Sequence, residues 1–145
     1  MQIMKFGVSM ALAMGMATAA SAQAGNQISV PIQGLRNNQG VVRCGLYASA
    51  AGFRQPGKEF RGVAAPIANQ QATCVFTDVP PGTYAVAVFH AENNETQLQT
   101  NFLGQPKEGY GFSRNPSTTF GAPEFNAAAY AYPGGVTSWP VQLTY

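Results

Sequence analysis

The stretch FTDVPPGTYAVAVFH, residues Phe76–His90, decides the fold. From Thr83 onward it is apolar at successive positions, which is typical of a central β-strand covered on both faces. The residues Pro80 to Gly82 predict a type II turn, in which a proline fixes φ at the first central position and Gly82 takes positive φ at the second. We therefore expect one strand to enter this turn and a central strand, Thr83–His90, to leave it.

Period-two alternation of apolar and polar residues, the signal of a half-buried strand, recurs along the chain. The segments that we expect to form strands are Gln27–Gln33, Val41–Ala48, Ala72–Val79 and Ser138–Tyr145, with a strand or a helical turn at Phe60–Ile67 and at Phe125–Tyr132. Short strands separated by turn residues predict an all-β chain. We expect a single antiparallel β-sandwich, transthyretin- or immunoglobulin-like, of about seven strands.

Residues 91 to 124 lack strand alternation and are rich in glycine and proline. So long an irregular stretch is uncommon in a compact domain unless it is functional or disordered. Disorder would leave several aromatic side chains, among them Tyr110, Phe112 and Phe120, in water. We therefore expect one long ordered loop that packs on the sandwich.

The first residues read as a targeting signal. Lys5 precedes an apolar stretch, Phe6–Ala20, and small-x-small sites follow at residues 20–22 and 22–24. This order is typical of a cleaved secretory signal peptide, and the apolar stretch is shorter than the roughly 20 residues of a membrane span. We expect a signal peptide at 1–22, a β-sandwich domain at 23–145 and a secreted or periplasmic protein without a membrane span after cleavage. The alternative is an anchor that the mature protein keeps.

The net charge limits the classes of partner, and the two cysteines suggest a covalent cross-link. The formal net charge is +2, from eight Lys and Arg and six Asp and Glu. No basic stripe could neutralise a phosphate backbone, which argues against nucleic acid as a partner. Cys44 and Cys74 are the only cysteines, and an even pair in an oxidising compartment predicts a disulfide. Two buried free thiols or a metal pair are the alternatives.

Several long stretches carry a family resemblance. They are GLRNNQGVVRCGLY (34–47), FTDVPPGTYAVAVFHAEN (76–93), TNFLGQPKEGYGFSRN (100–115) and GAPEFNAAAY (121–130). On these motifs the chain resembles the secreted bacterial family called domain of unknown function 2141. The resemblance implies a transthyretin-like sandwich of the kind seen in carboxypeptidase regulatory modules, and it implies no established reaction.

One segment departs from the family pattern. Family members often read His-Asp-x-Asn-x-Asn-Gly-x-Leu-Asp, which looks like a calcium loop of alternating oxygen ligands. This chain keeps Asn93 but has Ala91, Glu95, Thr96 and Gln99 at the other diagnostic positions. We interpret the segment as a degenerate calcium-like loop. No metal and no cofactor is assigned, although calcium remains open.

The candidate ligand or loop site is the group of polar and aromatic residues around this segment: His90, Glu92, Asn93, Asn101, Glu108, Tyr110 and Ser113. His90 is either a metal ligand or acid–base group, or a hydrogen-bonded anchor for the loop that follows. Glu108, among glycines and a proline, is interpreted as a carboxylate that pins its loop. The aromatic residues form either a platform for a sugar or peptide, or anchors that pack the loop.

Three functions follow from these readings. The first is a non-catalytic binding or structural module whose ligand meets the loop face at 90–101 and 104–113. The second is a metal-dependent or hydrolytic enzyme that uses His90 with Glu92 or Glu108. The third is an accessory subunit of a cell-envelope complex. No catalytic residue is assigned, and the partner is left as an envelope protein or a small ligand.

Overall fold

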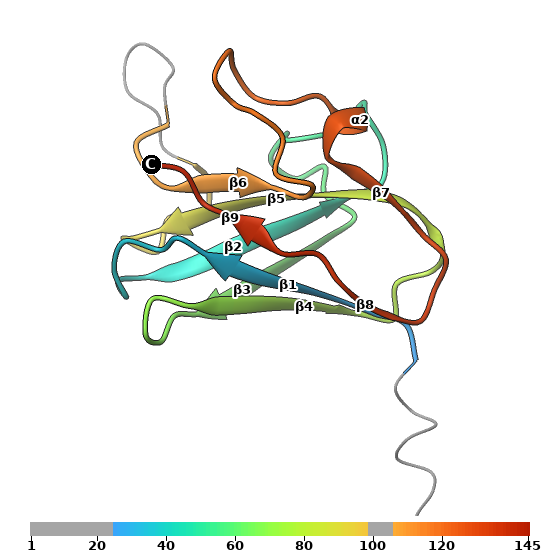
Figure 1. Cartoon of the computed structure of the whole chain (residues 1–145), viewed down its shortest axis with the longest axis horizontal. Coiled ribbons are helices and arrows are strands. Elements are labelled where there is room, and N and C mark those ends of the chain that lie inside the picture. The colour runs from blue at the N-terminus through green and yellow to red at the C-terminus, as the bar shows by residue number, and fades with distance from the viewer. Residues whose placement is uncertain (1–24, 99–105) are drawn as a thin grey trace, which may run out of the picture.

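The computed structural model describes residues 25–98 and 106–145, which form two β-sheets packed face to face (Figure 1). The first sheet contains β1 (Gln27–Gln33), β4 (Ala72–Thr77), β8 (Val136–Ser138) and β9 (Val141–Gln142). The second contains β2 (Val41–Tyr47), β3 (Arg61–Pro66), β5 (Gly82–Ala91), β6 (Tyr110–Phe112) and β7 (Ala129–Tyr132). A single helical turn, α2 (Phe125–Ala128), precedes β7. The predicted signal peptide lies outside the described residues.

The predicted all-β sandwich is confirmed, with two differences in detail. The described residues hold nine strands, two more than expected. One is β6 (Tyr110–Phe112), which lies inside the segment 91–124 that was expected to be a single loop. The other arises because the chain is split into β8 and β9 around Pro140, whose nitrogen has no hydrogen to donate. In addition, β8 and β9 run parallel to β1, so the first sheet is mixed, whereas β1 and β4 are antiparallel. The second sheet is antiparallel throughout, in the order β3-β2-β5-β6 with β7 also on β5.

Strand β5 is the centre of the second sheet, as its apolar sequence predicts. It pairs with β2 on one side and with β6 and β7 on the other. Ala85 and Val86 point to opposite faces, and both side chains are fully buried. The strand is therefore covered on both faces, and each face packs into a different hydrophobic cluster, as described below.

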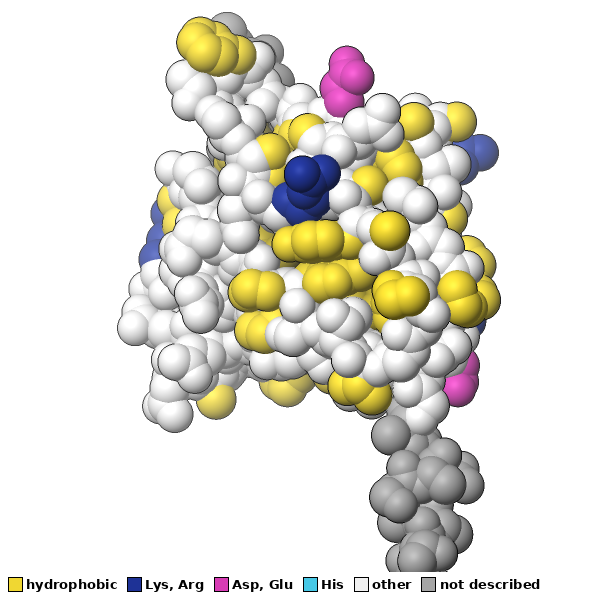
Figure 2. All heavy atoms as spheres, turned by 45° about the vertical axis from the view of Figure 1, so that its right-hand side comes forward, with side chains coloured by type: hydrophobic (Ala, Val, Ile, Leu, Met, Phe, Trp, Pro, Cys, Tyr) yellow, Lys and Arg dark blue, Asp and Glu magenta, His cyan; other side chains and the backbone are white. Residues whose placement is uncertain are grey.

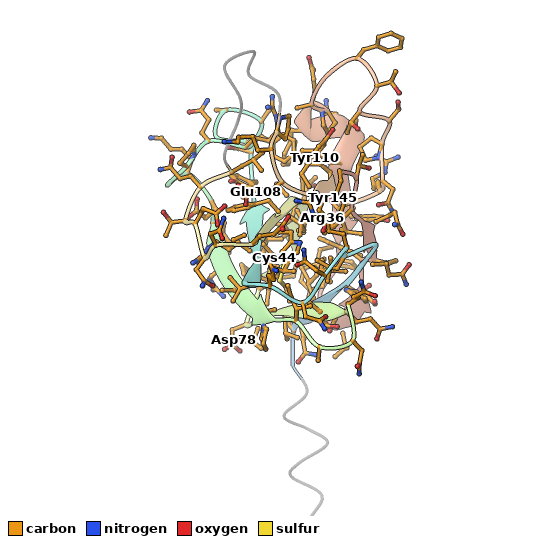
Figure 3. All side chains as sticks on the ribbon, turned by 90° about the vertical axis from the view of Figure 1, so that its left-hand side faces the viewer. Arg36, Cys44, Asp78, Glu108, Tyr110 and Tyr145 are labelled. Carbon is orange, nitrogen blue, oxygen red and sulfur yellow. A yellow bond between two sulfur atoms is a disulfide. The ribbon has the colours of Figure 1, made fainter. Side chains whose placement is uncertain are left out.

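The inner core lies between the two sheets and contains the disulfide. Cys44 on β2 and Cys74 on β4 are bonded across the sheets, with their Cα atoms 6.4 Å apart. Both residues are buried among the side chains of Val30, Phe76 and their neighbours, and Figure 3 shows Cys44 in the interior. The predicted disulfide is thus present, and it ties the two layers together.

The turn before β5 is not the predicted type II turn. Gly82 has no positive φ and is the first residue of β5, whereas Asp78 takes the left-handed conformation with φ of 55°. The Tyr84 hydroxyl donates a hydrogen bond to the Pro80 carbonyl at 2.7 Å, and a Cβ on Gly82 would lie 3.1–3.2 Å from this tyrosine. A Cβ on Gly82 would therefore crowd the tyrosine that folds back over the strand start, and the glycine serves this close contact instead of a turn with positive φ.

A second cluster covers one end of the second sheet's outer face. Its buried members, here called the outer cluster, are Tyr47, Phe53, Ala85, Phe112, Phe125 and Ala128. Phe53 contacts three other aromatic rings edge-on, at centroid distances of 5.4 to 6.0 Å. In Figure 1 the segment after β2 and the segment that carries α2 both lie on this side of the molecule.

One side of the sandwich is closed by aromatic stacking. Tyr130 on β7 lies flat on Trp139, with centroids 4.7 Å apart and planes 25° from parallel. Because β7 belongs to the second sheet and Trp139 follows β8 of the first, this stack bridges the layers. Figure 2, which brings this side of the molecule forward, shows hydrophobic side chains gathered in its middle below a basic side chain.

Candidate functional site

His90 lies on the inner face of β5 and is fully buried. Its Nε2 atom is 2.7 Å from the Gln39 carbonyl oxygen, and its Nδ1 atom is 2.7 Å from the Tyr145 hydroxyl. A carbonyl oxygen can only accept, so Nε2 carries a hydrogen and donates it to Gln39, while Nδ1 shares its hydrogen bond with the tyrosine hydroxyl. Both ring nitrogens are thus engaged inside the protein, which is the loop anchor that the sequence left as one alternative.

The backbone beside His90 explains a neighbouring glycine. Gly40 has φ of 69°, and a Cβ at this position would overlap the carbonyl oxygen of Ala91. Only glycine brings the 34–40 turn close enough for the Gln39 carbonyl to reach the histidine. His90 therefore joins β5 to this turn and to the segment at Tyr145, which is 55 residues away in the sequence.

Glu92 lies at the same end of the sandwich, where an arginine and an asparagine engage its carboxylate. Its Oε1 atom is 2.5 Å from Arg36 Nη2, and its Oε2 atom accepts from the Asn37 side chain at 3.1 Å. Burial acts to raise the pKa of Glu92, but the hydrogen bonds from Asn37 and Arg36 and the arginine charge outweigh it and lower the pKa. The Arg36 guanidinium also lies 4.7 Å over the ring of Tyr145 (Figure 3).

Glu95 and Glu108 form a carboxyl pair. The hydrogen bond from the Glu108 side chain lowers the pKa of Glu95, against the opposing effect of burial, and the Asn93 amide donates to Glu95 Oε1 at 2.6 Å. Glu108 is 6 % exposed, so its carboxyl group is largely removed from water.

Ser113 is a structural hydroxyl. It is fully buried, accepts from the Val86 amide at 2.8 Å and donates to the Ala128 carbonyl at 2.5 Å. It lies opposite Val86 on β5, four residues from His90, which is about 13 Å along a strand. The two side chains therefore do not meet, and a serine–histidine pair is not formed.

The remaining predicted residues belong to the degenerate calcium-like loop and its surroundings, part of which lies outside the described residues. Asn93 is exposed, and Asn101 and Gln99 of the degenerate calcium-like loop lie outside the described residues. Within 25–98 and 106–145, no group of three or more His, Cys, Asp or Glu side chains could hold a metal ion. Glu92 and Glu95 of that loop point their carboxyl groups to different partners, Arg36 and Glu108.

An open cleft of about 1180 Å³ lies on the outer face of the second sheet and is hereafter called the cleft. Its floor comes from β3, β2, β5 and β6. One row across these strands is Gly62, Gly45, Ala87 and Phe112, and the next is Ala64, Arg43, Phe89 and Tyr110. Its walls are parts of segments 54–59, 96–98 and 118–122. Among the predicted site residues that the structure describes, Tyr110 alone lines it.

The cleft and the outer cluster divide one face between them. Tyr47 lies at the border, since its ring packs on Phe53 and also lines the cleft. Burial raises the pKa of Tyr47, and the nearby Glu59 carboxylate adds to this effect. Sequence reasoning missed the cleft because a row of small residues is created by the register between strands, although the glycines at 45 and 62 inside strands were a local signal.

No helix in the described part of the chain is long and apolar enough to cross a membrane. Comparison with the curated proteins and with the solved structures found no match. A family model, described as "Uncharacterized protein conserved in bacteria (DUF2141)", matches residues 30–139. This range includes most of β1 and all of β2 to β8, and β9 follows it. The chain therefore belongs to the family DUF2141, as its motifs predict.

Proposed function

We propose that this protein is an exported, non-catalytic binding module that holds its ligand in the cleft. The observation that carries the proposal is the composition of the open part of the second sheet's outer face. Apart from Arg43, the side chains there are small or aromatic, whereas a sheet face that only meets water would be mostly polar. A large concave surface lined by such residues is the usual form of a ligand site.

The arrangement of the polar groups supports binding over catalysis. A general base must reach a proton of the substrate, but both ring nitrogens of His90 are bonded inside the protein and the ring has no exposed surface. Ser113 is likewise enclosed by backbone partners. None of the predicted acid–base residues, His90, Glu92 and Glu108, lines the cleft.

Export is supported by two features. Residues 1–22 have the charge, apolar stretch and small residues of a cleaved signal peptide. The disulfide between Cys44 and Cys74 suits an oxidising compartment. N-terminal sequencing of the protein recovered from the periplasm or the medium should begin after Ala22; a full-length protein that fractionates with the membrane would contradict export.

The binding role can be tested without knowing the ligand. Two-dimensional amide NMR spectra are recorded while isopropanol and phenol are titrated as small probes. We expect the largest shift changes at Gly45, Gly62 and Ala87, with weaker changes at exposed positions of β4 such as Thr73. Changes scattered over the surface, or gathered on the Tyr130–Trp139 side, would refute the proposal that the cleft is the binding site.

A further inference from the structure

We infer that the ligand of the cleft is a neutral glycan chain, stacked on aromatic rings across the strands of the second sheet. This inference rests on the proposed binding function and adds the chemical class of the ligand. It is carried by three properties of the cleft: a low floor that crosses four strands, aromatic rings beside it, and the absence of an unengaged charge from the floor.

The floor is low because its residues are small. Gly62, Gly45 and Ala87 lie directly opposite one another on adjacent strands. A Cβ on Gly45 would come within 2.9 Å of the Tyr47 ring, so this glycine lets the tyrosine fold back and form part of the floor. From β3 to β6 the row spans about 14 Å, three interstrand spacings, which is room for an extended chain of several sugar rings.

Several aromatic rings that line the cleft differ in how much of each ring is exposed. Phe89 and Tyr110 are half-buried neighbours in the second row, so part of each ring is open to the cleft. Tyr145 is 45 % exposed, and Phe120 on the 118–122 wall is fully exposed. Flat apolar rings with phenol hydroxyls suit sugars, whose C–H faces stack on them while the edges need hydrogen bonds.

The charges favour a neutral ligand over an ionic one. Arg43 is the charged residue of the floor, and its guanidinium already donates to the backbone carbonyl oxygens of Glu95 at 2.5 Å and Asn94 at 3.4 Å. Arg54 and Glu59, which also line the cleft, carry opposite charges. The walls add hydroxyl groups at Thr96, Thr118 and Thr119, which can both donate and accept.

An extended peptide fits this surface less well. Peptides bind to sheets chiefly by pairing with a free strand edge. Under the middle of the cleft, β2 and β5 are paired on both sides. Strand β6 is bonded to β5 on one side and, through Tyr110, to the Thr144 backbone on the other. At β2, β5 and β6 the floor therefore offers side-chain surface and no unpaired strand edge, and the free edge of β3 lies at the border of the cleft.

The test uses the mature protein with its disulfide intact and an array of immobilised glycans. The neutral probes are β-1,4-glucan, β-1,3-glucan, α-1,4-glucan, mannan and galactan; polygalacturonate is the acidic probe and hexaproline the peptide probe. We expect binding to at least one neutral glycan that persists at high salt. Binding only to polygalacturonate or only to hexaproline, or no binding to any neutral glycan, would overturn the inference.

Two variants locate the binding. In Gly62→Phe the new ring fills the floor; it should fold, because a Cβ there meets only the Glu59 side chain at 3.8 Å and φ is not positive. Thr73→Phe places the same ring on the exposed face of β4 as a control. We expect a tenfold or greater loss of glycan binding in Gly62→Phe and no loss in Thr73→Phe, with the fold checked by circular dichroism.

A third variant needs no change in the body of the fold. Phe120→Ala removes a ring that is fully exposed, so stability should not change, but glycan binding should fall at least threefold. Val136→Ala, at an exposed apolar residue away from the cleft, is its control. Glycan binding that none of the cleft variants weakens would overturn the inference.

The NMR titration and the glycan array separate this inference from the proposed function. If isopropanol and phenol map to the cleft but no neutral glycan binds, the glycan class is wrong and the proposed binding module stands. If the probes do not map to the cleft and no neutral glycan binds, both proposals fail.

Discussion

Reduction of the disulfide gives a measurable prediction for the whole fold. The bond joins residues 30 positions apart. In the chain-entropy account, a loop of this length lowers the entropy of the unfolded chain by about 12 cal/mol/K, which stabilises the native state by about 3.6 kcal/mol at 25 °C. With a urea slope of about 1.8 kcal/mol/M, reduction should lower the unfolding midpoint by about 2 M.

The assay compares oxidised protein, protein reduced with a phosphine, and the Cys44→Ala/Cys74→Ala double variant. The reduced protein keeps both sulfur atoms, so its loss reports the cross-link alone, and the double variant adds the loss of packing at two buried positions. The urea slope should also rise on reduction, because the unfolded chain expands. A loss below about 1 kcal/mol in a reversible transition would refute the reasoning that the bond constrains the unfolded chain.

Two further predictions concern single residues. Ser113→Ala leaves a buried amide and a buried carbonyl without their partner, so the free energy of unfolding should fall by about 2 kcal/mol in urea titrations. The control Ser117→Ala removes an exposed hydroxyl and should change this free energy by less than about 0.5 kcal/mol. Equal effects of the two substitutions would contradict the bridging role of Ser113. The pKa of Glu92 is lowered from 4.5 in the folded protein, so its contribution is present above pH 4.5 and is lost as the pH falls through the lowered value. Glu92→Gln should therefore lower the free energy of unfolding by about 1 kcal/mol or less at pH 7, because half of the Arg36 side chain is exposed, and should not change it at acid pH. A decrease that persists at acid pH, or an equal decrease in the control Glu124→Gln, would contradict the ion pair.

Much of the sandwich follows from local patterns. The alternation in Gln27–Gln33 and Ala72–Val79 places Ile28, Val30 and Phe76 in the core, because residues two apart share a face of a strand. The wrong prediction at Gly82 shows the limit of this reasoning. The motif Pro-Pro-Gly is compatible with a turn, but the glycine is required by the Tyr84 side chain that folds back over it.

The candidate site was harder to predict because its contacts join distant segments. His90 was recognised as an anchor or a ligand, but its partner Tyr145 is 55 residues away and no local pattern links them. The outer cluster depends on Phe53, which lies in a segment too irregular to predict. The cleft floor is set by strand register, which places Gly62 opposite Gly45 and Ala87 on the other side.

The two ends of the second sheet's outer face differ in what covers them. One end is buried under aromatic side chains, and the other forms the cleft that we propose as the binding site. At the Tyr47 end, Phe53 and Phe125 cover the sheet, and Ala85 beneath them is fully buried. Two residues further along the same face of β5, Ala87 is only partly covered and lies in the cleft. The strand that decides the fold thus carries alanine at both positions, and the difference lies in what covers them. The acid–base groups of His90, Glu92 and Glu108 lie outside the cleft, and around Arg43 the cleft floor consists of small and aromatic side chains. This division supports the proposal that the cleft holds its ligand by contact area.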